Sequence, residues 1–361
     1  MPDTSGAKPR TGQSSYIRPA PAAGFPRPAA GYPARMSAPG AMTYGYFLAC
    51  EDYGPQELVE QARMAEQAGF TSLWISDHFH PWTTAQGHSP FVWSVIGALA
   101  GATSLPVQTA VTCPTVRTHP AVIAQAAATS AVLLGEDRFR LGVGSGEALN
   151  EHILGTNWPS APMRLEMLEE AVGIIRQLMT GEEVSHSGKH YTVENARLYD
   201  VPPAPVPIDI AGFGDTAIEL AGRIGDGFVS MDADAEAVAR FRRAGGASFQ
   251  PARGGTKVCY GTDRAEAVRT VRERWPNMLL PGELPQVLPT PAHFEQAAHL
   301  VTDRMVEDSP IACGDDPEEH VRALAAYADA GFDAVHVNQI GPDIRGFFDF
   351  YRTKVLPQLT D

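Results

Sequence analysis

The order of short strand-like runs and longer helix-like runs constrains the fold of this chain more than any other feature. From residue 43 onward the two kinds of run alternate, which is typical of a parallel sheet with crossover helices. The expected strands are Tyr44–Cys50, Thr71–Ser76, Val107–Val111, Phe139–Val143, Pro207–Ala211, Gly227–Ser230, Thr256–Tyr260 and Ala334–Val337. Strands in this number and order predict an α/β fold, a closed (β/α)8 TIM barrel rather than an open sheet.

The expected helices fill the spaces between these strands, apart from two excursions. Gln56–Gln67 carries small and apolar residues on one face, and Gly69 follows it as the left-handed residue that ends many helices. The excursions are Ser185–Asp200 and a proline-rich insertion at about 275–315. Residues 43–361 are therefore predicted to form one barrel domain. The other expected helices are Val92–Ala102, Ala121–Leu134, Arg164–Met179, Thr216–Arg223, Ala233–Arg243, Glu318–Ala330 and Arg345–Val355.

Residues 1–42 differ from the rest of the chain in being rich in proline, alanine and glycine. The prolines recur too often for the continuous apolar segment of a secretory signal, and segments of this composition do not build a core. We expect a disordered leader there. No stretch of the chain approaches the roughly 18 consecutive apolar residues that a membrane span requires.

Charge and cysteine usage limit the partners of the chain. A formal net charge of −14 disfavours nucleic acid and anionic membranes, which need a basic face. The four cysteines, Cys50, Cys113, Cys259 and Cys313, form no C-x-x-C pair, so neither a zinc knuckle nor a disulfide framework is indicated. The expectation is a cytoplasmic protein with no nucleic-acid or membrane partner.

Two polar runs follow predicted strands where barrel enzymes place their catalytic groups. In a parallel barrel these groups lie just past the carboxyl ends of the strands. The second strand leads into Ser76–Trp82, and the fourth leads into Gly142–Glu151. We therefore expect both loops to open into the same mouth of the barrel.

His78 and Glu147 are the candidate proton-transfer residues in these runs. An imidazole can take the proton from a hydroxyl group while hydride leaves the carbinol carbon. Glu147 lies in a glycine-rich turn, where the backbone can pass close to a planar ligand. The alternatives are a buried, hydrogen-bonded histidine and a loop carboxylate in water.

A second candidate contact for a ligand is the turn Gly212–Gly214 after the fifth strand. It leads straight into a predicted helix, so free N–H groups and the helix dipole should face the mouth and could hold a phosphate without a lysine. The alternative is a plain strand-to-helix turn.

The pair His78 and His80 also raises the alternative of a metal site. Such a site needs further ligands from later strands, but their ends offer no histidine, and His336 lies within the last strand. We therefore expect no metal.

Several of these segments resemble the luciferase-like superfamily, in particular the F420-dependent glucose-6-phosphate dehydrogenases and their relatives. The resemblance extends from about Thr43 to the C-terminus. It implies a barrel oxidoreductase, a dehydrogenase or reductase, that uses the deazaflavin coenzyme F420, and it implies a homodimer. The segments that carry it are Ser76–Phe79 with Pro81 and Trp82, Ala121–Ala126, Gly144–Glu151 and Ala221–Phe228.

The resemblance also implies roles for individual residues. His78 would be the base on the substrate hydroxyl, Glu147 the proton partner beside the deazaflavin, and Trp82 would pack over the reacting centre. Asp77 would hold the cofactor. Ala110 and Val111 match a position where the family bends the backbone behind the deazaflavin, often through a non-proline cis peptide. Further contacts to the cofactor and its phosphate would come from Ser145, Gly146, Asn150, Ala211, Gly212, Phe213 and Gly214.

One departure from that family bears on the substrate. The sugar-phosphate enzymes grip phosphate with lysine and arginine from the loop after the sixth strand and from the long insertion. Here that loop, Ser230–Asp234, is acidic, and Pro281–Asp316 contains Arg304 as its only arginine or lysine. We therefore expect a neutral alcohol, or a ketone in reverse, rather than glucose 6-phosphate. An FMN-dependent monooxygenase on the same barrel, a metal-dependent hydrolase and a non-catalytic F420 binder are the alternatives.

Overall fold

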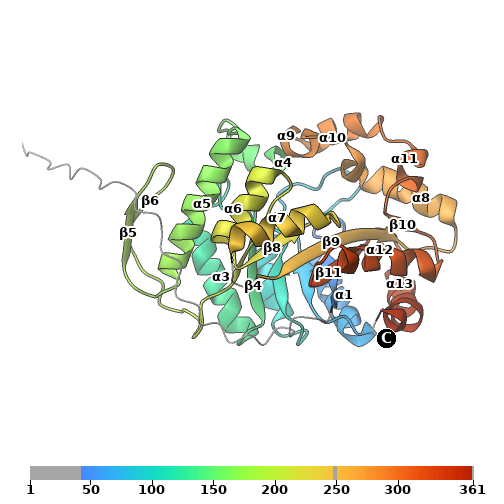
Figure 1. The fold of residues 1–361 in the computed structure, drawn as a ribbon, viewed down its shortest axis with the longest axis horizontal. Coiled ribbons are helices and arrows are strands. Elements are labelled where there is room, and N and C mark those ends of the chain that lie inside the picture. The colour runs from blue at the N-terminus through green and yellow to red at the C-terminus, as the bar shows by residue number, and fades with distance from the viewer. Residues whose placement is uncertain (1–41, 247–249, 360–361) are drawn as a thin grey trace, which may run out of the picture. The chain divides into compact units, whose positions relative to one another are not determined.

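A computed structural model describes residues 42–246 and 250–359 and confirms the closed barrel (Figure 1). All neighbouring barrel strands are parallel, and the pairings of β11 with β1 and of β8 with β9 close the sheet. The predicted disordered leader, except for Met42, lies outside the described residues. The barrel strands are β1 (Thr43–Leu48), β2 (Leu73–Ile75), β3 (Val107–Thr109), β4 (Phe139–Val143), β7 (Ile208–Ala211), β8 (Gly227–Ser230), β9 (Ala252–Cys259) and β11 (Ala334–Gln339).

Helices between the strands cover the outside of the sheet (Figure 1). Pro55 starts α1, and Gly69 ends it with a φ of 98°, as the sequence predicts. In the described part of the chain no helix is both long and apolar enough to cross a membrane. The main helices are α1 (Pro55–Ala68), α2 (Val92–Leu99), α3 (Pro120–Leu134), α5 (Ala161–Leu178), α6 (Asp215–Ile224), α7 (Ala235–Gly245), α8 (Arg264–Arg274), α12 (Pro317–Asp329) and α13 (Ile344–Phe350).

Strand β9 begins four residues earlier than the sequence predicts. The missed residues include Gly254 and Gly255, which are poor strand formers by propensity. A Cβ at residue 254 would overlap the ring of Tyr327, and a Cβ at residue 255 would lie 2.6 Å from Cζ3 of Trp74. Close packing on both faces of the strand therefore requires glycine at these two positions.

The two excursions have regular structure. The first is an antiparallel hairpin of β5 (Val184–Ser187) and β6 (Thr192–Ala196). The insertion, predicted to be irregular, contains short helices and ends in β10 (Ala312–Cys313), which pairs with β9. Its apolar side chains form one buried cluster with Trp82 and Leu149, so the insertion covers the loops after β2 and β4. The short helices are α9 (Leu284–Val287), α10 (Pro291–Ala298), α11 (Asp303–Glu307) and a 3-10 turn at Pro276–Leu279.

A charged cluster fills the amino-terminal end of the barrel interior. Asp209 on β7 is completely buried and is bound by Arg140 from β4 and Arg253 from β9. The bond from β9 passes across β8, which places the cluster inside the barrel. Burial alone would raise the pKa of Asp209, but the two guanidinium groups hold it below its usual range.

Candidate active site

His78 lies at the carboxyl end of the barrel, against a carboxylate that the sequence analysis did not single out. Its Nε2 atom is 3.3 Å from Oε1 of Glu51, which follows β1, and both side chains are nearly buried. The Ser76 hydroxyl donates a 2.6 Å hydrogen bond to the other carboxylate oxygen of Glu51. An acid–imidazole pair is therefore built from the first two strand ends.

Asn150 joins the loop after β2 to the loop after β4. Its Oδ1 accepts hydrogen bonds from the N–H groups of Phe79 and His80 at 2.9 and 3.3 Å. Nδ1 of His80 lies 3.0 Å from the carbonyl oxygen of Leu149. The two loops thus meet, as the sequence predicts, and the amide of Asn150 is largely engaged with the protein backbone.

Both ring nitrogens of His78 face an acceptor. Nδ1 lies 3.1 Å from the carbonyl oxygen of His80 and 3.2 Å from Nδ2 of Asn150, while Nε2 faces Glu51. Because Oδ1 of Asn150 accepts two backbone N–H groups, its Nδ2 group is the donor. A neutral ring can accept from Asn150 at Nδ1 or, with its proton on Nδ1, donate to the His80 carbonyl and keep Nε2 as the basic nitrogen. A protonated ring can donate to Glu51 and to the His80 carbonyl. Both the neutral and the protonated imidazole therefore find partners in the site.

Trp82 packs beside His78, with ring centroids 5.0 Å apart. Its backbone N–H donates to Oε1 of Gln86 at 2.7 Å, and its ring meets Phe294 of α10 edge-on at 5.1 Å. The insertion thus holds Trp82 in place next to the imidazole.

The Asp77 carboxylate is hydrogen-bonded to other side chains of the protein. It accepts a 2.7 Å hydrogen bond from the hydroxyl of Thr112 and a 2.9 Å one from Nη2 of Arg117. Nε of Arg117 lies 3.6 Å from Glu151, and burial raises the pKa of Glu151 to about 7. The predicted contact between Asp77 and the cofactor stays a prediction.

Residues from three strand ends form an apolar strip at the mouth. Val111 after β3 and Ala211 at the end of β7 both flank Gly144, where a Cβ would lie 2.8 and 3.6 Å from their side chains. Ala110, Val111 and Ala211 are only half-buried. The peptide bond between Ala110 and Val111 is cis, at the position that the resemblance indicated.

The glycine-rich turn after β4 brings Ser145, Gly146 and Glu147 to the same end. Gly146 has a φ of 89°, which favours glycine, and α4 (Ala148–Glu151) begins just after Glu147. The electrostatic neighbours of the half-buried Glu147 carboxylate are Cys113, Glu151 and Arg164, whereas the carboxylate that contacts His78 is Glu51. The structure brings together the loops that carry His78 and Glu147, and a catalytic role for Glu147 stays a prediction.

The turn after β7 leads directly into α6, as expected. Gly212 packs so tightly against the first turn of α6 that a Cβ would lie 2.9 Å from the backbone of Ala217. Phe213 and Gly214 are exposed, and the helix begins at Asp215. The amino end of α6 therefore lies at the same end of the barrel as His78.

Glu51 is the main site residue that the sequence analysis missed. The signal that could have found it is its position, since Glu51 and Asp52 follow the first strand as His78 follows the second. Lys257 was also missed. It is an isolated lysine in an otherwise uncharged stretch of β9 and is almost completely buried.

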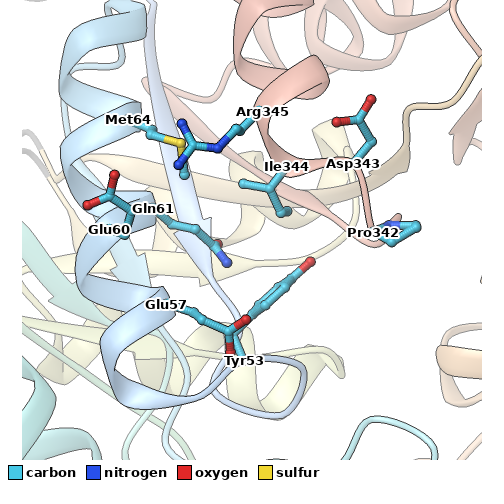
Figure 2. A pocket seen from close by; sticks show the side chains of 9 residues that line it. All are labelled: Tyr53, Glu57, Glu60, Gln61, Met64, Pro342, Asp343, Ile344 and Arg345. Carbon is cyan, nitrogen blue, oxygen red and sulfur yellow. The ribbon is translucent and has the colours of Figure 1, made fainter.

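A surface groove between α1 and α13 holds none of these groups (Figure 2). It is open to solvent and mixes acidic, aromatic and apolar side chains. Its lining is Tyr53, Glu57, Glu60, Gln61, Met64, Pro342, Asp343, Ile344 and Arg345.

Across residues 42–246 and 250–359, no group of three or more His, Cys, Asp or Glu side chains is placed to hold a metal ion. His80, the second histidine of the H-x-H run, instead binds the backbone of the loop after β4.

The profile of the family described as luciferase-like monooxygenase matches residues 38–334. The chain belongs to the luciferase-like monooxygenase family. Two relatives of this luciferase-like chain are an F420-dependent glucose-6-phosphate dehydrogenase of Microbacterium testaceum and an F420-dependent hydroxymycolic acid dehydrogenase of Mycobacterium tuberculosis. The first is 35% identical over 88% of this chain and 97% of the relative, and the second is 36% identical over 91% of each.

A solved structure has the same arrangement of the chain. It is an F420-dependent secondary alcohol dehydrogenase in complex with an F420-acetone adduct, and it superposes with a TM-score of 0.82 at 30% identity. The match covers 89% of this chain and all of the solved chain. The whole barrel is therefore shared.

Proposed function

We propose that this chain is an F420-dependent oxidoreductase that transfers a hydride between an alcohol, or the corresponding ketone, and the deazaflavin. The observation that carries the proposal is His78, whose ring nitrogens face Glu51 and the His80 carbonyl at the carboxyl end of the barrel. The relatives named F420-dependent dehydrogenases support the choice of cofactor.

The apolar strip fits a planar ring. Ala110, Val111 and Ala211 leave half-buried apolar surface, and Gly144 lets Val111 and Ala211 approach each other. The amino end of α6 offers backbone N–H groups to a phosphate. These segments, with Ser145 and Gly146, would hold the cofactor. When bound, the deazaflavin supplies a carbon that accepts or donates hydride.

Side chains of this protein then accept and stabilise the proton of the substrate hydroxyl. His78, with its neutral-state proton on Nδ1, takes the hydroxyl proton at Nε2 as the alcohol is oxidised, and Glu51 and the His80 carbonyl stabilise the resulting imidazolium. Trp82, which packs against Phe294, excludes water from one side of the His78 imidazole. In the reverse direction the imidazolium returns the proton to the ketone oxygen.

The charges around the mouth favour a neutral substrate over a sugar phosphate. Arg304, the only arginine or lysine of residues 281–316, is 86% exposed and pairs with Asp308. In the loop after β8, burial raises the pKa of Asp232, and nearby Asp234 raises it further. A phosphate dianion would find little compensation from either segment.

The test is reduction of oxidised F420 by a panel of secondary alcohols, with each alcohol deuterated at the carbinol carbon. We expect deuterium on the reduced deazaflavin. The His78→Ala variant should bind F420 as tightly as the unmodified chain but turn over about 10²–10⁴-fold more slowly. Full activity in this variant would contradict the assignment of the base.

A second candidate, an FMN-dependent monooxygenase, is favoured by the description of the matching family. It predicts a yellow complex with FMN and oxygen consumption when a flavin reductase is added.

A further inference from the structure

Lys257 carries a buried charge at the carboxyl end of the barrel interior. Its side chain leaves β9 on the inward face, 3% of the residue is exposed, and Nζ lies 3.6 Å from the ring centroid of Trp275 and 4.9 Å from that of Phe47. Its one hydrogen bond to the described residues is a long one, 3.4 Å to Oδ1 of Asn338. Burial lowers the pKa of Lys257 to about 8, while Glu51 and Asp52 act in the opposite direction.

No described carboxylate forms an ion pair with this ammonium group within 4.0 Å. Asp52, one of its two acidic neighbours, accepts hydrogen bonds from other donors. Nη2 of Arg274 lies 2.8 Å from Oδ1, and Nε1 of Trp275 donates to Oδ2 at 2.6 Å. The two aromatic rings compensate the charge only in part. A methionine of similar length would avoid the desolvation of an ammonium ion, so the lysine lowers the stability of the fold.

The remaining acidic neighbour is Glu51, the partner of His78. Asp52 and Glu51 are adjacent in the chain, and Asp52 fixes the indole on which the ammonium group rests. On the other side, Nδ2 of Asn338 donates to the carbonyl oxygen of Phe47 at 3.1 Å. Lys257 is thus held between Asn338 and the indole of Trp275, and this indole is bound by Asp52, the chain neighbour of Glu51.

We propose that Lys257 is a positioning residue for the pair of Glu51 and His78. Its positive charge keeps Glu51 ionised against Nε2 and thereby sets the pH at which the pair takes up a proton. This inference rests on the proposed function only where enzyme rates are used to test it. Lys257 acts through Glu51 and is not assigned a contact with the substrate.

Other charged and titratable groups surround Glu51, and the test has to separate them from Lys257. The end of β1 contributes Cys50 and Asp52, the loop after β2 contributes Asp77 and His78, and α8 contributes Arg274. Burial raises the pKa of the Cys50 thiol well above its usual value, so this group is neutral. Arg274 is bound to Asp52. Lys257 is therefore the charge near Glu51 that can be removed without breaking an ion pair.

The first experiment follows the ring protons of His78 by NMR during a pH titration of the whole protein without cofactor. The signal is assigned from its loss in His78→Asn. We compare Lys257→Met, which removes the charge, with Lys257→Arg, which keeps it. Without the cation the pair holds its proton more tightly, so the midpoint should rise by about one pH unit in Lys257→Met. It should stay close to the unmodified value in Lys257→Arg.

Thermal unfolding of the same variants shows whether Lys257 is merely structural. We expect Lys257→Met to unfold at the same temperature as the unmodified protein or above it. An unchanged midpoint in a folded Lys257→Met variant would overturn the proposal. So would an equal shift in both variants, because the charge would then not be its cause.

The second experiment tests whether Lys257 acts through Glu51. In a Glu51→Gln background, Lys257→Met should shift the titration midpoint much less than it does in the unmodified protein. A shift of the same size would contradict the proposed action through Glu51.

If no alcohol reduces F420, the proposed function fails, yet the titration of His78 still decides the role of Lys257. With an active enzyme, the acid limb of the plot of log kcat/KM against pH should shift to higher pH in Lys257→Met, by the same amount as the titration midpoint.

Discussion

At the amino-terminal end of the barrel interior, Asp209 lies completely buried between Arg140 and Arg253, and its charge is fully compensated. At the carboxyl-terminal end, Glu51 faces His78 and Lys257 has aromatic rings where an ion-pair partner would be expected. Both ends bury charge, but every member of the first cluster is in an ion pair, whereas Lys257 forms none with the described residues. Removing one partner of a buried ion pair is strongly destabilising, whereas a buried charge without an ion-pair partner already costs stability and is expected at functional sites.

The largest expected effect is at the compensated end. Asp209→Asn leaves Arg140 and Arg253 buried without their carboxylate and should lower the free energy of unfolding by about 3–5 kcal/mol. Urea unfolding measures the loss. The matched control is Asp308→Asn, which breaks an exposed ion pair and should cost well under about 1 kcal/mol. Equal losses in the two variants would show that the buried cluster contributes no more to stability than an exposed ion pair.

At the uncompensated end, Glu51→Gln should reduce activity rather than stability. The amide keeps an acceptor for Ser76 but no longer stabilises the imidazolium, so we expect kcat to fall by about 10–100-fold. The free energy of unfolding should change by less than about 1 kcal/mol. A variant that unfolds readily but retains its kcat would assign Glu51 to the fold instead.

A third effect extends the comparison to the pH dependence of stability and is smallest near pH 6.5, where it begins. Burial lowers the pKa of His336, within β11, from 6.5 to about 3. Between these values the unfolded chain binds a proton at this histidine that the folded chain does not. The contribution of neutral His336 to the free energy of unfolding is therefore complete above pH 6.5 and is lost as the pH falls toward 3. The contribution is about 1.4 kcal/mol per pH unit. His336→Asn should flatten the dependence of unfolding free energy on pH in this window, and an unchanged slope would contradict it.

The sequence predicted the barrel well because alternation of strands and helices is a repeated signal. It predicted β9 poorly because Gly254 and Gly255 are required by Tyr327 and Trp74, which are distant in the chain. The helices of the insertion were missed because prolines obscure them, although each of α9 and α10 has a proline in its first turn.

The candidate site was predicted in part. His78 and Trp82 stood out because they follow a strand in a run of unusual residues, and the structure brings their rings together. Glu51 did not stand out, because a lone glutamate after a strand has no distinctive pattern. The cofactor contact of Asn150 stays a prediction. The structure adds that its amide fixes the loop of His78, a contact that requires two distant loops to be placed in space.

The most direct test of this account is a titration of the purified protein with oxidised F420, FMN and NADP, because the choice of cofactor fixes the reaction class before any substrate is known. We expect one F420 to bind per chain, with a Kd about a hundredfold or more below those of FMN and NADP, a difference of about 2.7 kcal/mol. Tighter binding of FMN than of F420 would contradict the account and favour the monooxygenase.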